Sequence, residues 1–175
     1  NYVFVGLRRA GKSYLMYQQI QSLLNDGHQP EEILYFNFED DRLVNLTVED
    51  LDLIKVSYEE LYPHKPIFFL DEIQIVEHWE KFARRLADQQ YRVYITGSNA
   101  KMLSAEIATT LGGRYIVQNV YPFSFSEFLK ASKIEIGPTW YYKNRTEIVR
   151  TFSDYFSYGG LPELMLDRKS TRLNS

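Results

Sequence analysis

The segment that most constrains the fold is Gly6-Leu7-Arg8-Arg9-Ala10-Gly11-Lys12-Ser13, which matches the pattern G-x-x-x-x-G-K-[ST] in full. Its glycines permit a tight backbone curl whose N–H groups point inward and form a nest for phosphate oxygens. Lys12 supplies a positive charge for the β- and γ-phosphates, and Ser13 supplies a hydroxyl for Mg²⁺. We therefore predict that residues Gly6 to Tyr14 bind the phosphates of a nucleotide.

The residues on either side of this loop supply the structural context that the motif requires. Tyr2-Val3-Phe4-Val5 is typical of a buried strand that runs into the loop. After the loop, apolar residues recur at helical spacing, at Leu15, Met16, Ile20, Leu23 and Leu24, and Asn25-Asp26-Gly27 predicts where that helix ends. The N-terminus of such a helix adds its own positive dipole to the loop. The alternative, a glycine-containing turn with an exposed lysine, is disfavoured by this context.

Strands and helices are expected to alternate along the rest of the first 121 residues. Apolar runs at 33–38, 67–70, 92–96 and 115–117 predict four further strands. Helices are expected after Thr47, which can cap with Asp50 three residues on, from Trp79 to Ala87, and as a short stretch from Ala100 to Leu111. This alternation indicates an α/β fold of three layers around a central parallel sheet of five strands.

The strand pattern stops beyond Pro122, and helices are expected at 123–129 and 148–158. We therefore predict a nucleotide-binding core over residues 1–121 and a small helical lid, or the start of a next domain, over 122–166. The remaining residues, 167–175, resemble one reading frame of a common sequencing-adapter oligonucleotide. With no starting methionine, the chain is expected to be a fragment that ends in a non-native tail.

Composition narrows the classes of protein that fit. The 175 residues include no cysteine, which excludes disulfides and thiolate metal sites and fits a reducing, cytoplasmic location. No apolar run approaches the roughly 20 residues that a membrane-spanning helix needs, so no membrane partner is expected. The net charge of −3 argues against a generally basic surface for nucleic acid. Nucleic-acid binding through aromatic stacking has no interleaved basic residues to support it.

A second set of candidate residues follows the apolar run Ile67-Phe68-Phe69-Leu70, which reads as a central strand of the sheet. Asp71 and Glu72 come directly after it, at the end of the strand where open α/β sheets bind ligands. Asp71 is predicted to hold Mg²⁺, directly or through water, opposite Ser13. Glu72 is predicted to orient and deprotonate an attacking water. The two side chains would point opposite ways on a continuing strand, so the chain is expected to turn here.

Three further positions are weaker candidates. Ser98 or Asn99, at the end of the fourth strand, is expected to sense the γ-phosphate, although either residue also suits an ordinary helix cap. Arg114, after Gly112-Gly113, is a candidate to stabilise transferred-phosphate charge in a neighbouring subunit, or is a salt-bridged surface arginine. Arg84-Arg85 is the rival pair for that role. For Arg8 and Arg9, which lie inside the loop, the sequence leaves two alternatives: contact with phosphate or a partner, or exposure to solvent.

Together these strings resemble a family, the AAA-type ATPases of archaea and bacteria whose loop reads G-x-R-R-x-G-K-S and which usually carry a C-terminal domain of unknown function. The matching strings are Gly6 to Ser13, Tyr35 to Asp40, Phe69-Leu70-Asp71-Glu72-Ile73-Gln74, Ile95 to Ala100, Gly113 to Tyr115, Pro122 to Phe128 and Tyr158 to Pro162. The resemblance implies ATP as the nucleotide, dependence on Mg²⁺, and an AAA-like core with a helical lid. The resemblance also implies that the family's N-terminal lead-in and C-terminal domain lie outside these residues.

Two functions compete on these grounds. The first is a Mg²⁺-dependent ATP hydrolase, because Glu72 is a base that a pure binding protein does not need. The second is a nucleotide-controlled switch with little hydrolysis of its own, which acts on an unknown protein partner. A homo-oligomer in which Arg114 acts on a neighbour is compatible with both. A small-molecule kinase is disfavoured, because such kinases seldom place a Glu directly after the metal-binding Asp.

Overall fold

The computed structural model describes residues 1–98, 109–134 and 145–163. These residues form two compact units. The first consists of Asn1–Gly6 and Lys12–Val120, and the second of Leu7–Gly11 together with the chain from Tyr121 onward. The predicted domain limits at residues 121 and 166 stay predictions.

A five-stranded parallel sheet forms the centre of the first unit. Its strands are β1 (Tyr2–Gly6), β2 (Ile33–Asn37), β3 (Ile67–Asp71), β4 (Arg92–Ser98) and β5 (Ile116–Val120). Their order is β2-β3-β4-β1-β5, and every neighbouring pair is parallel. The predicted five-stranded parallel sheet is therefore confirmed. Because all strands run the same way, their C-terminal ends lie on the same side of the sheet. Gly6, Asp71 and Ser98 are the last residues of β1, β3 and β4, so they lie together at these C-terminal ends.

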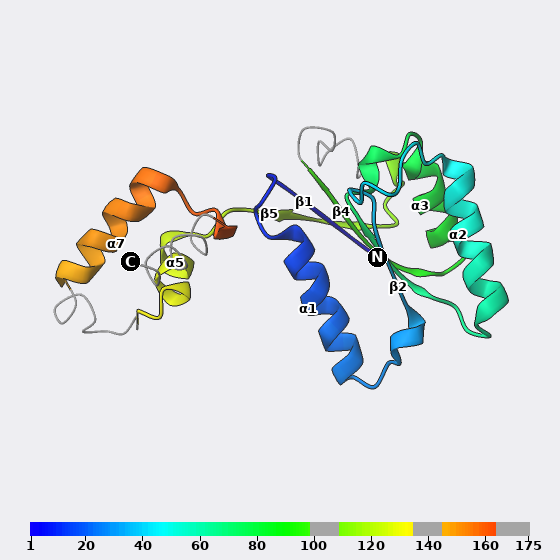
Figure 1. The fold of residues 1–175 in the computed structure, drawn as a ribbon, viewed down its shortest axis with the longest axis horizontal. Coiled ribbons are helices and arrows are strands. Elements are labelled where there is room, and N and C mark those ends of the chain that lie inside the picture. Colours follow the sequence, from blue (N-terminus) through cyan, green and yellow to red (C-terminus); the bar gives the residue numbers. More distant parts are fainter. Residues whose placement is uncertain (99–108, 135–144, 164–175) are drawn as a thin grey trace. The chain divides into compact units, whose positions relative to one another are not determined.

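Helices cover both faces of the sheet, as an α/β fold requires. Helix α1 (Lys12–Asn25) lies on one side, and α2 (Val48–Leu61) and α3 (Trp79–Asp88) lie on the other (Figure 1). Alternate strand residues enter the two cores. The core under α2 and α3 includes Val3, Val5, Phe68, Leu70, Val93 and Ile95, and the core under α1 includes Phe4, Ile67, Phe69 and Tyr94. The middle strands are therefore buried on both faces, which explains the uninterrupted apolar run of β3.

Local signals in the sequence set the helix limits. Thr47 caps α2 as predicted: its side chain accepts a hydrogen bond from the Asp50 backbone N–H, and the Asp50 carboxylate accepts one from the Thr47 N–H at 2.8 Å. The fourth predicted helix, from Ala100 to Leu111, falls mostly on residues outside those described. None of the described helices is long and apolar enough to cross a membrane.

The second unit is helical in its described part after residue 120. Helices α5 (Phe125–Ala131) and α7 (Arg145–Tyr158) occupy the positions where helices are predicted. Their contact is aromatic, with the rings of Phe125 and Phe152 edge to face at 5.1 Å between centroids. The Tyr155 hydroxyl donates to the Phe123 carbonyl at 2.9 Å, and the Phe123 N–H donates to the Gly160 carbonyl at 2.8 Å. No strand follows β5 in the part of the chain that the structure describes.

Candidate active site

The predicted phosphate loop connects the last residue of β1, Gly6, to the first residue of α1, Lys12. Two of its residues are left-handed, Arg9 with φ 67° and Gly11 with φ 100°, and the Ala10 N–H closes a turn onto the Leu7 carbonyl at 3.2 Å. Glycine adopts this conformation freely, whereas holding a non-glycine residue such as Arg9 there costs about 1–3 kcal/mol. Such strain is characteristic of ligand-binding loops, and the loop has the curled backbone that the motif predicts.

The side chains of this loop are largely exposed. Arg8 and Arg9 lie at the surface, and Arg9 forms an ion pair with Glu163 of the same unit, at 3.0 Å between Nε and Oε2. Tyr14, on the first turn of α1, is 66% exposed. Arg9 therefore has an acidic partner within its own unit, and contact of Arg8 and Arg9 with phosphate stays a prediction.

Lys12 differs from the other basic residues near the loop because it is only 4% exposed. Its Nζ lies 3.0 Å from Oε1 of Glu72, which is also buried. A buried ammonium must be paired, since the interior solvates a charge poorly. The structure thus brings together two residues that are 60 positions apart and that were assigned separately from the sequence.

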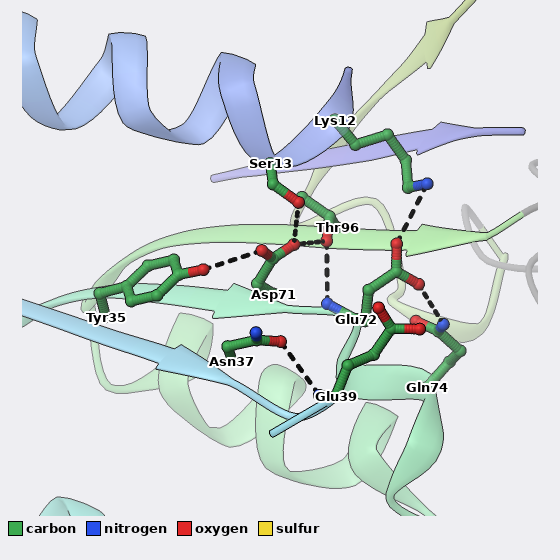
Figure 2. A network of polar contacts seen from close by, with 9 residues as sticks. All are labelled: Lys12, Ser13, Tyr35, Asn37, Glu39, Asp71, Glu72, Gln74 and Thr96. Carbon is green, nitrogen blue, oxygen red and sulfur yellow. Dashed lines mark hydrogen bonds and ion pairs between the residues drawn. The ribbon is translucent and has the colours of Figure 1, made fainter. Parts of the chain in front are cut away.

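Asp71, the last residue of β3, accepts hydrogen bonds from three hydroxyl groups (Figure 2). Ser13 Oγ donates to its Oδ1 at 3.1 Å, and Thr96 Oγ1 donates to the same oxygen. Tyr35 Oη donates to its Oδ2 at 2.9 Å. The carboxylate is therefore fixed by residues of α1, β2 and β4, and it lies beside Ser13 as the sequence predicts.

Glu72 turns the chain away from the strand. Its backbone is left-handed, with φ 56° and ψ 40°, and its N–H donates to Thr96 Oγ1 at 2.9 Å. Its Oε2 accepts a hydrogen bond from Gln74 Nε2 at 2.5 Å, while its Oε1 faces Lys12 (Figure 2). This turn is the one that the sequence requires if adjacent carboxylates are to serve one site.

The protonation of Tyr35 determines the direction of the hydrogen bonds around Asp71. Burial, the hydrogen bond with Tyr17 and the charge of Asp71 together raise the pKa of Tyr35 far above its usual value. The phenol therefore keeps its proton and donates it to Asp71. Because Tyr35 has a single hydrogen, the 3.1 Å contact between its hydroxyl and that of Tyr17 has Tyr17 as the donor.

The remaining sequence candidates that the structure describes are not part of this network. Ser98 is the last residue of β4 and pairs in register with Gly6, and Asn99 lies outside the described residues. Arg114 Nε lies 2.5 Å from Oδ1 of Asp88 at the end of α3, and both side chains are partly exposed. Of the rival pair, Arg85 forms an ion pair with Asp52 at 2.5 Å.

Three members of the network were missed as functional residues from the sequence: Tyr35, Gln74 and Thr96. Thr96 is fully buried and follows a register pair, Leu70 with Ile95, by one position, which puts it beside Asp71. A polar residue within the apolar run of β4 was the signal that could have found it. Gln74 belongs to the Asp-Glu-Ile-Gln string, and Tyr35 to the Tyr-Phe-Asn-Phe string of β2.

The residues of the site suit a metal ion that is shared with a ligand. Among the residues that the structure describes, no group of three or more His, Cys, Asp or Glu side chains could hold a metal alone. Ser13 and Asp71 offer one hydroxyl and one carboxylate. Mg²⁺ is usually held by one or two carboxylates together with substrate phosphates, rather than by an all-protein cage.

A glycine-rich loop between a central strand and a helix, with Asp and Glu at the end of another central strand, defines the phosphate-loop class of α/β proteins. Residues 1–129 match the family described as "AAA domain", and the chain belongs to this family.

The structure also resembles that of Hsp104 in a closed-state cryo-EM reconstruction with ATPyS and FITC casein. The TM-score is 0.61 at 15% identity, over 95% of this chain and 32% of that one. The S. cerevisiae Hsp104:casein complex in its extended conformation gives the same TM-score at 16% identity, over 95% of this chain and 32% of that one. At this identity the likeness concerns the fold.

Two relatives match nearly the whole chain. It is 38% identical over 165 residues to the uncharacterized protein MJ1544 of Methanocaldococcus jannaschii, covering 94% of this chain and 36% of the relative. It is 37% identical over 169 residues to an uncharacterized protein of Haemophilus influenzae, covering 94% of this chain and 40% of the relative. The chain therefore spans well under half the length of these relatives.

Proposed function

We propose that this AAA domain is a Mg²⁺-dependent ATP hydrolase. The observation that carries the proposal is the placement of Lys12, Ser13, Asp71 and Glu72 in one connected network at the ligand-binding edge of the sheet. Three of these are the ammonium, hydroxyl and metal-binding carboxylate that recur in phosphate-loop enzymes, and the fourth is a carboxylate suited to act as a base.

Each group has a role in holding the substrate. The curled loop backbone and Lys12 bind the β- and γ-phosphates of ATP. Ser13 and Asp71 hold Mg²⁺, which supplies positive charge for the phosphate oxygens when it is bound. The three hydroxyl donors around Asp71 fix the orientation of its carboxylate before any ligand arrives. Preorganised groups of this kind need little rearrangement during reaction.

Glu72 is the proposed general base. It accepts one proton from a water molecule as the water oxygen attacks the γ-phosphorus, and the bond between that phosphorus and the ADP oxygen breaks. The products are ADP and phosphate, and the proton on Glu72 returns to phosphate or solvent. The charge is balanced throughout, and no further reactant is required.

The second candidate, a nucleotide-controlled switch, is favoured by the buried ion pair between Lys12 and Glu72. While that pair persists, Lys12 is not available to phosphate and one oxygen of Glu72 is not available to water. A switch of this kind would act on a protein partner whose identity the family does not supply. The trans role of Arg114 in a homo-oligomer and a cytoplasmic location stay predictions, and a nucleic-acid partner stays an alternative without support in the sequence.

Phosphate release from Mg²⁺-ATP, followed at several protein concentrations, tests the proposal. We expect release that requires Mg²⁺ and is lost when EDTA is added. A rate per subunit that rises with protein concentration would favour an arginine supplied by a neighbour. Tight ATP binding without release of phosphate would favour the switch and contradict the hydrolase.

A further inference from the structure

Gln74 is the one side chain in the contacts of Glu72 to which the proposed chemistry gives no task. It lies in the short 3₁₀ helix Ile73–Ile75, two residues after Glu72, in the Asp-Glu-Ile-Gln string that the sequence singles out. Its Nε2 donates to Oε2 of Glu72 at 2.5 Å (Figure 2). Turning the amide around would set its oxygen against a carboxylate oxygen, so the donor must face Glu72.

The other atom of the Gln74 amide is not tied to its surroundings by a hydrogen bond in the part of the chain that the structure describes. Oε1 of Gln74 is buried and has no hydrogen-bond partner among the residues that the structure describes. A glutamine retained to tie the 3₁₀ helix to its surroundings would satisfy both ends of its amide, because buried polar groups are ordinarily paired. The hydrogen bond that the Gln74 amide makes in the described structure goes to Glu72, so its contribution is made through that carboxylate.

The two carboxylate oxygens of Glu72 have partners with different proposed roles. Oε1 is paired with Lys12, and Lys12 is also the group that the proposed function assigns to the phosphates. Oε2 is bonded to Gln74, which has no phosphate to bind in that proposal. When Lys12 turns to phosphate, Oε1 is released while Oε2 stays held. The atom that can accept a proton from water is therefore Oε1.

We infer that Gln74 is a positioning residue, which holds Glu72 by Oε2 so that Oε1 is presented to the attacking water. The inference rests on the proposed function and deepens it by naming the residue that orients the base. The left-handed backbone of Glu72 and its N–H bond to Thr96 fix the start of the side chain. Gln74 fixes its far end, and a general base needs both, since a small misplacement of a reacting group costs much of its rate.

Replacement of the amide tests this role in the purified protein. We expect Gln74→Leu to lower kcat by about 10- to 100-fold, the range that follows from losing one hydrogen bond to a charged group, with little change in ADP affinity. Gln74→Glu keeps the shape but sets a second carboxylate beside Glu72. It should lower kcat as well and move the acid side of the kcat–pH profile to higher pH, because the pair then takes up a proton more readily.

The decisive comparison is the double variant Glu72→Gln/Gln74→Leu. If Gln74 acts only through Glu72, the double variant has the same residual turnover as Glu72→Gln alone. Losses that multiply would show an independent role and overturn the inference. Gln21→Leu, an exposed glutamine on α1 that bonds Asn25, is the matched control and should leave turnover unchanged.

The outcomes separate the two proposals. Wild-type release of phosphate with an unaffected Gln74→Leu variant overturns the role of Gln74 and leaves the hydrolase standing. No release by the wild type overturns both. If Gln74→Leu fails to fold, as judged by its melting curve, the Gln74→Glu variant carries the test, and an unchanged pH profile with full turnover contradicts the inference.

Discussion

Asp71 and Glu72 are adjacent carboxylates at the end of one strand, yet their surroundings differ in kind. Asp71 is held by three neutral hydroxyls from α1, β2 and β4. Glu72 is held by an ammonium and an amide, on a left-handed backbone. Neutral donors fix a carboxylate and leave its charge available to a metal ion. An ammonium instead neutralises the carboxylate charge until the ammonium moves to another anion. The difference suits a metal ligand at Asp71 and a base with controlled availability at Glu72.

Thr96 is the residue that joins the two halves of this comparison. Its hydroxyl donates to Asp71 and accepts from the backbone N–H of Glu72, which satisfies its single hydrogen and one of its lone pairs. The residue is fully buried in β4. One side chain therefore couples the position of the Asp71 carboxylate to the turn at Glu72.

The largest expected effect is that of Lys12→Ala, which removes the ammonium that pairs with Glu72 and that the proposed function assigns to the phosphates. We expect calorimetry to show ATP binding abolished or severely reduced, because the loop loses its one buried ammonium. Leaving Glu72 buried without its partner should also lower the free energy of unfolding by about 3–5 kcal/mol. Lys81→Ala, which changes an exposed lysine of α3, is the control. Equal ATP affinity in the Lys12 variant and the wild type would refute the site.

Glu72→Gln should act in opposite directions on turnover and on binding. The amide keeps the shape but cannot take a proton, so phosphate release should fall by about 10²- to 10⁴-fold. ADP, whose binding involves no hydrolysis, should bind several-fold more tightly, because Lys12 no longer leaves an ion pair to reach phosphate. Phosphate release and ADP calorimetry measure the two effects. Unchanged turnover would remove Glu72 from the mechanism, and unchanged ADP affinity would show that the ion pair does not compete with phosphate.

The features that could be predicted from the sequence are those that depend on residues close together in the chain. The phosphate loop, the five strands and the pair Asp71-Glu72 follow from motifs and apolar runs within a few residues of each other. Apart from the local bond between Gln74 and Glu72, the contacts that distinguish the two carboxylates join residues 24 to 60 positions apart, such as Thr96 with Glu72 and Lys12 with Glu72. These depend on which strands are neighbours and in what register, which a single sequence does not specify. The left-handed turn at Glu72 likewise could not be predicted, because no glycine or asparagine occupies that position.

Thr96→Val should impair both carboxylates at once. Valine fills the same space, but Asp71 loses a donor and the Glu72 N–H loses its acceptor in a buried position. Leaving that N–H unpaired should lower the free energy of unfolding by about 1–3 kcal/mol, as measured by urea denaturation. Turnover should fall and its Mg²⁺ requirement should rise together. Thr96→Ser, which keeps the hydroxyl, is the control. A change in only one of the two kinetic properties would show that Asp71 and Glu72 are positioned independently.

The smallest expected effect is confined to the Asp71 half. Tyr35→Phe removes the one hydroxyl on Oδ2 and leaves Ser13 and Thr96 on Oδ1. Because residues that orient a metal ligand typically contribute about 10-fold or more to metal affinity, the Mg²⁺ concentration for half-maximal turnover should rise by about that factor. When EDTA removes Mg²⁺, ATP binding does not involve Asp71 as a metal ligand. The affinity for ATP measured in EDTA should therefore stay the same in the Tyr35 variant.

Tyr17→Phe is the matched control for this last prediction. It removes the outer hydroxyl, which donates to Tyr35, and leaves the bond from Tyr35 to Asp71 in place. The Tyr17 side chain is about half exposed, so water can replace its hydroxyl, and the Mg²⁺ requirement should barely move. Equal effects of the two substitutions would show that the aromatic contact between these rings, 5.6 Å between centroids, matters more than the donor on Asp71. A large loss of turnover in Tyr35→Phe at saturating Mg²⁺ would show that Tyr35 also affects Glu72. It would contradict the separate roles proposed for the two carboxylates.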